Sequence, residues 1–172
     1  MKIHAVLLSI AFACSASIAT ADSTAKITDV HLCCKGCVTG AEKAVSEVPG
    51  AKAEVDQDAS TVTLSAPDAA TVQKAADALV SAGYFGKCKD GAKLDASTGA
   101  KGEKVQSLKI EGVHLCCGKC VKAVDQAVKT VPGVKEQNAT KGAKSFEVTG
   151  DFNDQEVFNA LQKAGLTGKV AK

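Results

Sequence analysis

A chain of 172 residues with a formal net charge of +2 can hold one medium-sized domain or two small ones. Its lysines are scattered among aspartates and glutamates, which gives no basis for a nucleic-acid or membrane-surface partner. Tryptophan is absent and aromatic residues make up 3% of the chain, so any core is built from Val, Ala, Leu and Ile. The eight cysteines are the feature that needs an explanation.

Residues 1–21 are predicted to be a secretory signal peptide. A positively charged start leads into an apolar run over 6–13, and 19–21 (Ala-Thr-Ala) fits an A-x-A cleavage site. A membrane anchor would need about 20 uninterrupted apolar residues, and serines and threonines interrupt this stretch. Lipid attachment at Cys14 is the lesser alternative. We therefore expect an exported protein, periplasmic or secreted, that starts near Asp22 and has no membrane partner after cleavage.

The mature chain contains an internal repeat. A shift of 83 residues aligns 30–34 with 113–117 and 48–50 with 131–133. Self-similarity over whole segments marks a duplicated domain. Two copies, each long enough to close its own core, indicate tandem domains and not a solenoid. The predicted domains are 22–89 and 105–172, and 90–104, rich in Gly, Ala, Lys and Asp, is predicted to be a flexible linker.

Each repeat opens with a strand and a helix. The strands are predicted at 26–32 and 108–115, and the helices that follow have apolar residues spaced by three, four and three positions, which is one helical face. A Pro-Gly pair ends each helix, because proline cannot continue the hydrogen-bond ladder and glycine tolerates the turn. The apolar positions are Val38, Ala41, Val45 and Val48 in the first copy, and Val121, Val124, Val128 and Val131 in the second.

Two more strands, a second helix and a short last strand complete each repeat. Alternating apolar residues predict strands at 51–55 and 61–65, then at 134–138 and 144–149. Asp68, and either Asn153 or Asp154, are candidate N-caps for the second helix. That helix is expected to stop at Gly83 or Gly165, with Tyr84 and Phe85 packing in the core and at its rim. Its apolar residues are Val72, Ala76 and Leu79 in the first copy, and Val157, Leu161 and Ala164 in the second.

This order of elements predicts an α+β fold class: two ferredoxin-like β-α-β-β-α-β sandwiches in tandem, each with two helices on one face of an antiparallel sheet. A unit of about 65–70 residues has a marginal core. A bound metal ion can therefore contribute to its stability.

A Cys-Cys-x-x-Cys motif lies at the start of the first helix of each repeat. The last two cysteines of each motif are three residues apart across the loop that opens the helix, so their sulfurs can converge where backbone N–H groups favour thiolate. Thiolates select Cu(I), Zn(II) and heavier soft ions over Mg or Ca. Cys88, outside the motifs, is expected to be a small core residue of the last strand. The candidate ligands are Cys33, Cys34, Cys37 and His31 in the first copy, and Cys116, Cys117, Cys120 and His114 in the second.

The residues from each motif to the following Pro-Gly pair, 34–50 and 117–133, resemble the heavy-metal-associated domain family. The resemblance extends over nearly all of the mature chain except the linker. This family includes copper chaperones, N-terminal modules of copper-transporting ATPases and the periplasmic mercury-binding protein. The resemblance implies that two cysteine pairs bind metal, with Cu(I) expected first and Zn(II) second. The pairs are Cys34 with Cys37 and Cys117 with Cys120.

The loop before each motif departs from that family. The family has Gly-Met-x-Cys, whereas here the loop is two residues longer, if Gly112 is the family glycine, and it carries an additional cysteine and histidine. A linear two-thiolate Cu(I) site would become three-coordinate, or a Cys3His set would suit tetrahedral zinc. Adjacent cysteines bind one ion only with strain, so the roles of Cys33 and Cys116 stay open. His31 and His114 are equally expected as ligands or as hydrogen-bonding neighbours.

The expected function is metal binding and not enzymatic catalysis: trafficking, buffering or sequestration, with up to one soft ion per domain. Ligand exchange would pass the ion to another metal-carrying protein. Two alternatives stay open. The first is a thiol–disulfide oxidoreductase, because C-x-x-C at a helix start is also a redox geometry, although nothing resembles the thioredoxin frame. The second is a protein-binding module stabilised by disulfides, since exported thiols tend to pair.

Overall fold

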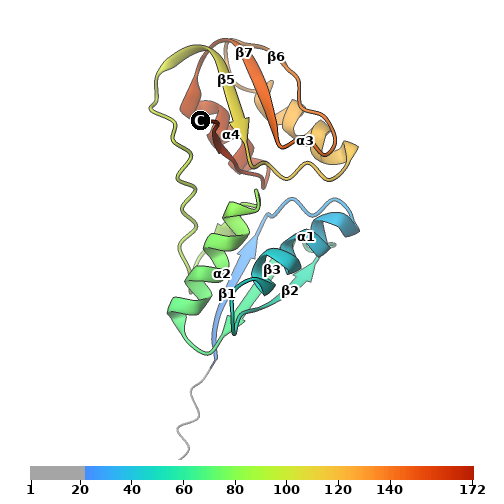
Figure 1. Ribbon diagram of the computed structural model, residues 1–172, viewed down its shortest axis with the longest axis vertical. Coiled ribbons are helices and arrows are strands. Elements are labelled where there is room, and N and C mark those ends of the chain that lie inside the picture. The colour runs from blue at the N-terminus through green and yellow to red at the C-terminus, as the bar shows by residue number, and fades with distance from the viewer. Residues whose placement is uncertain (1–21) are drawn as a thin grey trace, which may run out of the picture.

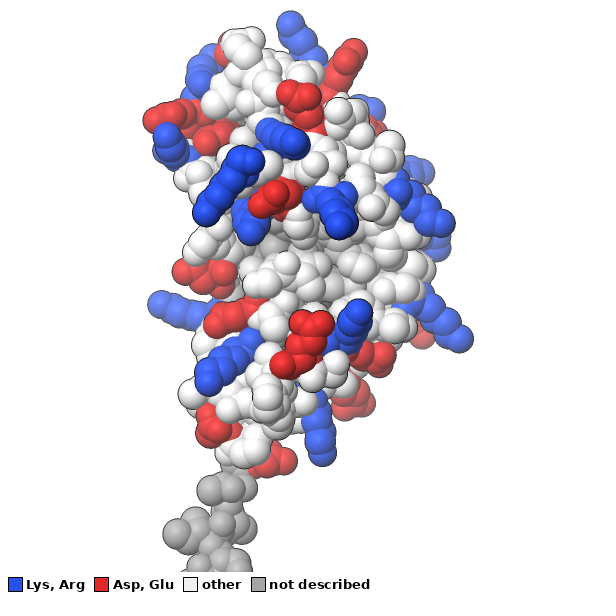
Figure 2. All heavy atoms as spheres, in the orientation of Figure 1, with Lys and Arg blue, Asp and Glu red and all other residues white. Residues whose placement is uncertain are grey.

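The computed structural model describes residues 22–172 (Figure 1). The predicted signal peptide and its cleavage site lie outside these residues, apart from the start of the mature chain, and stay a prediction. Among the described residues, no helix combines the length and the apolar character that crossing a bilayer requires. The face drawn in Figure 2 carries lysines interspersed with aspartates and glutamates, as the sequence predicts.

The first half of the described chain, residues 22–88, forms one four-stranded antiparallel sheet with two helices. Its strand order is β2-β3-β1-β4. The helices α1 and α2 pack against each other and against this sheet. The elements are β1 (Ser23–Thr28), α1 (Lys35–Ser46), β2 (Lys52–Asp56), β3 (Thr61–Ala66), α2 (Ala69–Ser81) and β4 (Lys87–Cys88).

The second half, residues 104–172, repeats this arrangement. Its strand order is β6-β7-β5-β8, again antiparallel throughout. The predicted order of elements and the mixed α/β class are therefore confirmed, with two sheets and four helices among the described residues. That each half is a separate domain stays a prediction. The elements are β5 (Lys104–Glu111), α3 (Gly118–Val128), β6 (Val134–Gln137), β7 (Ser145–Asn153), α4 (Asp154–Lys163) and β8 (Lys169–Val170).

The first strand of each half ends earlier than predicted. The expected ranges 26–32 and 108–115 gave the strands four residues that belong to loops. The backbone turns at Asp29 and at Gly112, whose φ angles are 61° and 79°. A positive φ is incompatible with an extended strand, and it is most accessible to glycine and, among the rest, to Asn and Asp. The apolar residues after the turn are still buried, and this is why the pattern resembled a longer strand.

Alternating burial places the core between each sheet and its helices. In β1, Ala25 and Ile27 are buried while the residues between and beside them are more exposed. On α1 and α3 the first buried position is the last cysteine of the motif, Cys37 and Cys120, each 0% exposed. The packing of each core thus fixes one sulfur of each motif in place.

The second helices begin at the predicted caps. Asp68 accepts a hydrogen bond from the backbone N–H of Thr71 at 2.8 Å. In the second half the cap is Asn153, which accepts from two backbone N–H groups of α4. Asp154 has another role, because its buried carboxylate accepts three backbone N–H groups from residues 101–103. The segment predicted to be a flexible linker is therefore hydrogen-bonded at its C-terminal end to α4.

The two halves face each other through the ends of α2 and α4. Tyr84 and Leu166 form an antiparallel bridge across the junction. The backbone N–H of Thr167 donates to the Gly83 carbonyl at 3.0 Å, and that of Phe85 donates to the Gly165 carbonyl at 3.2 Å. This reciprocal pairing brings the loop before α1 and the loop before α3 face to face (Figure 1).

Glycine is required at the two positions where the halves meet. Gly83 has φ 88°, and a Cβ there would collide with the backbone of Gly112 and His114 in the opposite loop. Gly165 has φ 76°, and a Cβ there would lie 2.5 Å from the Asp29 carbonyl oxygen. Each half therefore ends its second helix in a glycine that packs on the other half's loop.

Candidate metal centre

The first helix of each half starts at the middle cysteine of the motif. Cys34 and Cys117 are the N-caps of α1 and α3, in extended backbone conformation, and neither side chain caps its own helix. Their thiols are thus free to reach outward. One turn later, Cys37 and Cys120 lie on the buried helical face, so the sulfurs of each motif approach one point from the loop and from the helix.

The six motif sulfurs form one cluster that spans both halves. Ten Sγ–Sγ distances lie between 3.5 and 3.8 Å. Six of these join the two halves, and the shortest, at 3.5 Å, are Cys33 to Cys117 and Cys37 to Cys116. The sequence predicted sulfurs converging within each motif, and did not predict that the two motifs meet.

The additional cysteines take part in this cluster. Cys33 lies within 3.7 Å of three other sulfurs, and two of them belong to the second half. Cys116 lies within 3.7 Å of three sulfurs, including Cys34 and Cys37 of the first half. Each pair of adjacent cysteines shares two sulfur neighbours, one in its own motif and one in the other half, so both members belong to the same group of sulfurs.

The two histidines are placed differently. A ring nitrogen of His31 lies within 4.8 Å of the sulfurs of Cys33 and Cys120, and its buried Nε2 has no hydrogen-bond partner among residues 22–172. His114 is stacked on Tyr84, with ring centroids 4.5 Å apart, and its Nε2 lies 3.1 Å from the tyrosine hydroxyl. Only His31 belongs to a group of potential ligands in the described residues.

Tyr84 is a site residue that the sequence did not reveal as such. Its hydroxyl donates to the Cys37 carbonyl at 2.8 Å and pairs with His114, so it joins α1 to the opposite loop. Gly40 makes this possible, because a Cβ there would meet the tyrosine hydroxyl. The sequence predicted core packing, and the ring is indeed 0% exposed. A buried tyrosine hydroxyl usually has a partner, and that was the available signal.

Burial and mutual hydrogen bonding raise the pKa of three of these thiols, Cys33, Cys116 and Cys120, and so favour their protonated form. Desolvation, followed by the hydrogen bond to Cys117, raises the pKa of Cys33 to about 12. Desolvation also raises the pKa of Cys116, and the hydrogen bond to Cys37, followed by burial, raises that of Cys120. The pKa of Cys117 is lowered, chiefly by the backbone N–H of Cys120 at the start of α3. A positive charge added beside these sulfurs would favour their ionised form.

Cys88 stands apart from the cluster. It lies in β4, opposite Ile27 of β1, and its thiol donates to the Asp90 carbonyl at 3.1 Å. It is half-buried and packs against the edge of the core, in the last strand of the first half as predicted. It has no part in the sulfur groups of the described residues.

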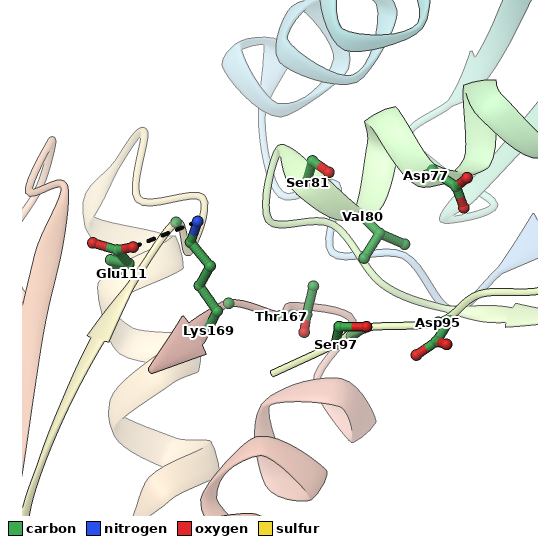
Figure 3. Close-up of a pocket in the computed structure, with 11 residues that line it drawn as sticks. Asp77, Val80, Ser81, Asp95, Ser97, Glu111, Thr167 and Lys169 are labelled. Carbon is green, nitrogen blue, oxygen red and sulfur yellow. Dashed lines mark ion pairs between the residues drawn. The ribbon is translucent and has the colours of Figure 1, made fainter. Parts of the chain in front are cut away.

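A cavity of about 410 Å³ lies at the junction on another side. Asp77 and Ser81 of α2, Asp95 and Ser97 of the connecting segment, and Lys169 line parts of its wall (Figure 3). Lys169 pairs with Glu111 at 3.5 Å. Its lining includes no cysteine or histidine, so the cavity is separate from the cluster.

Comparisons with known proteins give weak likenesses. No family model matches the chain, and no curated protein matches it. The N-terminal domain of PacS from Synechocystis PCC6803 is 22% identical over 40% of this chain and 100% of its own, with a TM-score of 0.36. The N-terminal soluble domains of CopA from Bacillus subtilis are 14% identical over 88% of this chain and 95% of theirs, with a TM-score of 0.34.

A second structure, of the water-soluble region of the P-type ATPase CopA from Bacillus subtilis, is 16% identical over 88% of this chain and 92% of its own, with a TM-score of 0.29. Such soluble ATPase regions are among the proteins that the sequence resemblance includes. With every TM-score below 0.5, these likenesses carry no argument about the site. The case for its chemistry rests on the placement of the side chains.

Proposed function

We propose that this protein binds soft metal ions, Cu(I) first and Zn(II) second, through the cysteines of its two motifs. Its role would be metal trafficking, buffering or sequestration outside the cytoplasm. One observation carries the proposal: six thiols from two distant parts of the sequence have their sulfurs 3.5–3.8 Å from their neighbours. Thiolate ligands prefer soft cations.

The electrostatics of the cluster support a cationic cargo. Six sulfurs within 3.5–3.8 Å of their neighbours cannot all ionise without compensating positive charge, because like charges at such distances repel strongly. A bound soft cation supplies that charge, and metal coordination deprotonates thiols outright. The cluster therefore provides the ligands of a soft-metal site, and a bound cation would provide the positive charge that balances the thiolates.

The position of the cluster supports exchange of the ion with a partner. Cys34 and Cys117 are half-exposed at the helix N-termini, while Cys37 and Cys120 are buried behind them. A thiolate of another protein can approach from the outer side and replace one ligand at a time. The export of the protein rests on the N-terminal sequence alone.

The sulfur arrangement favours metal binding over a disulfide function. A disulfide joins two sulfurs, whereas every motif cysteine here has at least three sulfur neighbours. An oxidoreductase also needs an exposed thiol with a low pKa as its nucleophile. Burial raises the pKa of Cys33 and Cys116 instead, whereas the pKa of Cys117 is lowered.

Competition for Cu(I) tests the proposal. The reduced mature chain should retain Cu(I) against a chromophoric chelator, and should not catalyse reduction of insulin disulfides. Cys37→Ser and Cys120→Ser should each weaken retention, while Cys88→Ser, the same change outside the cluster, should not. Loss of all Cu(I) to a weak chelator, together with insulin reduction, would show a redox protein.

A further inference from the structure

The six sulfurs lie close to the corners of an octahedron. The ten short distances are ten of the twelve edges of that solid, and the two remaining edges join the adjacent cysteines of each motif, whose sulfurs lie within 4.8 Å. The three pairs left over are opposite corners. They are Cys37 with Cys117, Cys34 with Cys120, and Cys33 with Cys116.

This shape offers three-coordinate sites and no four-coordinate thiolate site. A tetrahedral ion needs four sulfurs that are all mutual neighbours, but any four corners of an octahedron include an opposite pair. The groups of potential ligands in the described residues have three members each. The centre of a triangle with sides of 3.5–3.8 Å lies about 2.0–2.2 Å from each corner, close to a metal–thiolate bond of about 2.3 Å.

Four of the triangular faces can be chosen so that each of the six sulfurs belongs to two of them. Three of them are groups whose sulfurs all lie within 4.8 Å of one another, and the fourth is bounded by distances of 3.5, 3.7 and 3.8 Å. Every cysteine belongs to two of these faces, so each sulfur can bridge two ions. The faces are Cys33–Cys34–Cys37, Cys34–Cys116–Cys117, Cys37–Cys116–Cys120 and Cys33–Cys117–Cys120.

From this geometry we infer that the protein holds a single four-copper cluster, Cu(I)4S6, shared between its halves, in place of one ion in each motif. The inference rests on the proposed function and specifies its site. Cu(I) accepts three thiolate ligands, whereas zinc prefers four. On loading, six thiols release six protons and bind four Cu(I) ions without any redox change. The charge of the site then goes from zero to −2.

The additional cysteines and two neighbouring side chains, Lys119 and His31, fit a shared cluster with a charge of −2. All three faces that contain sulfurs of both halves include Cys116 or Cys33, so the additional cysteine of each motif is needed for bridging. The Lys119 ammonium reaches from α3 to the Cys33 carbonyl at 3.5 Å, so a positive charge crosses the junction beside the cluster. His31 lies beside one face, within reach of Cys33 and Cys120.

Native mass spectrometry of the reduced mature chain, titrated anaerobically with Cu(I), tests the inference. We expect a monomer with four Cu(I) to appear directly, with little of the two-copper species, because bridging ligands make binding cooperative. X-ray absorption of the loaded protein should show sulfur neighbours and a copper–copper shell. Two copper ions bound independently, or four held between two chains, would overturn the shared cluster while leaving soft-metal binding in place.

Serine variants further distinguish a shared four-copper cluster from one copper ion bound independently in each motif. In a Cu(I)4S6 cluster, Cys33→Ser and Cys116→Ser each remove a bridge and should lower the stoichiometry below four, as Cys34→Ser does. Cys88→Ser, outside the cluster, should keep four. If Cys33→Ser and Cys116→Ser bind as many copper ions as the unaltered chain, the inference fails. If no variant and not even the unaltered chain retains Cu(I), the proposed function fails with it.

Discussion

The two halves supply equivalent sulfurs but surround them differently. His114 of the second half is stacked on Tyr84 and hydrogen-bonded to it, whereas Nε2 of His31 is buried and has no hydrogen-bond partner in the part of the chain that the structure describes. The cause lies at one position. Tyr84 follows the glycine that ends α2, and the residue that follows the equivalent glycine after α4 is Leu166, which has no hydroxyl.

The first helices show the matching difference. Gly40 of α1 leaves room for the tyrosine hydroxyl, and the corresponding residue of α3 is Ala123. The two motifs thus have the same cysteines in different surroundings. One histidine is tied into the packing of the junction, and the other is left beside the sulfurs. Identical motifs therefore need not have identical roles, and four experiments test this difference between the halves.

The largest effect on the free energy of unfolding is expected from Gly83→Ala, which disturbs the contact between the two halves. The change adds left-handed strain of about 1–2 kcal/mol and drives a methyl group into the backbone of Gly112 and His114. We expect the free energy of unfolding in urea to fall by about 3 kcal/mol or more. Gly142→Ala is the matched control, because Gly142 also has a positive φ but nothing within 4 Å. Equal losses in the two variants would mean that the close approach at Gly83 is not restrictive.

The next effect separates the histidines. If His31 serves the metal site, His31→Ala should weaken Cu(I) retention by about 10–100-fold, the range for a residue that supports metal ligands. His114→Ala should weaken it less, and should instead lower the free energy of unfolding of the metal-free protein by about 1–2 kcal/mol, through loss of the stacking and of the hydrogen bond. Equal effects of both variants on retention would remove the distinction between the halves.

A smaller effect is expected from the tyrosine hydroxyl. Tyr84→Phe leaves the Cys37 carbonyl and Nε2 of His114 without this partner, which should lower the free energy of unfolding by about 1–3 kcal/mol. Gly40→Ala should also destabilise, because its methyl group meets the same hydroxyl. The double variant should therefore lose less than the sum of the two single losses, as measured by urea unfolding. Strict additivity would show that the two groups do not interact.

Much of this molecule follows from its sequence because the information is local. The helical spacing from Val38 to Val48 and the alternation at Val62 and Leu64 predict elements that the structure contains. The repeat predicts that the order occurs twice. The ends of the strands were harder to predict from the sequence. The strands end where the backbone adopts a positive φ at Asp29 and Gly112, and the apolar pattern continues past both residues.

The meeting of the two motifs could not be predicted in this way. It depends on how the halves dock, which is set by the bridge between Tyr84 and Leu166 and by close approach at Gly83 and Gly165. Periodicity and motif spacing describe each half by itself, so they suggested one ion in each. A glycine at the end of a helix is also common for purely local reasons. Only the coordinates of both halves reveal its second contact.

The smallest effect concerns Lys35-Gly36 and Gly118-Lys119, which exchange residues between the motifs and predict no difference from sequence. A Cβ on Gly36 would lie 3.4 Å from the Cys116 sulfur, whereas nothing lies within 4 Å of one on Gly118. Gly118→Ala should therefore stabilise the metal-free protein by up to about 1 kcal/mol, the helix propensity gained by alanine at an open position. Gly36→Ala should gain less in urea unfolding, because its methyl group needs the Cys116 thiol to shift. If Gly36→Ala raised the free energy of unfolding more than Gly118→Ala, the Cys116 thiol would lie farther from α1 than in the structure. The sulfurs of the two halves would then be less closely packed there.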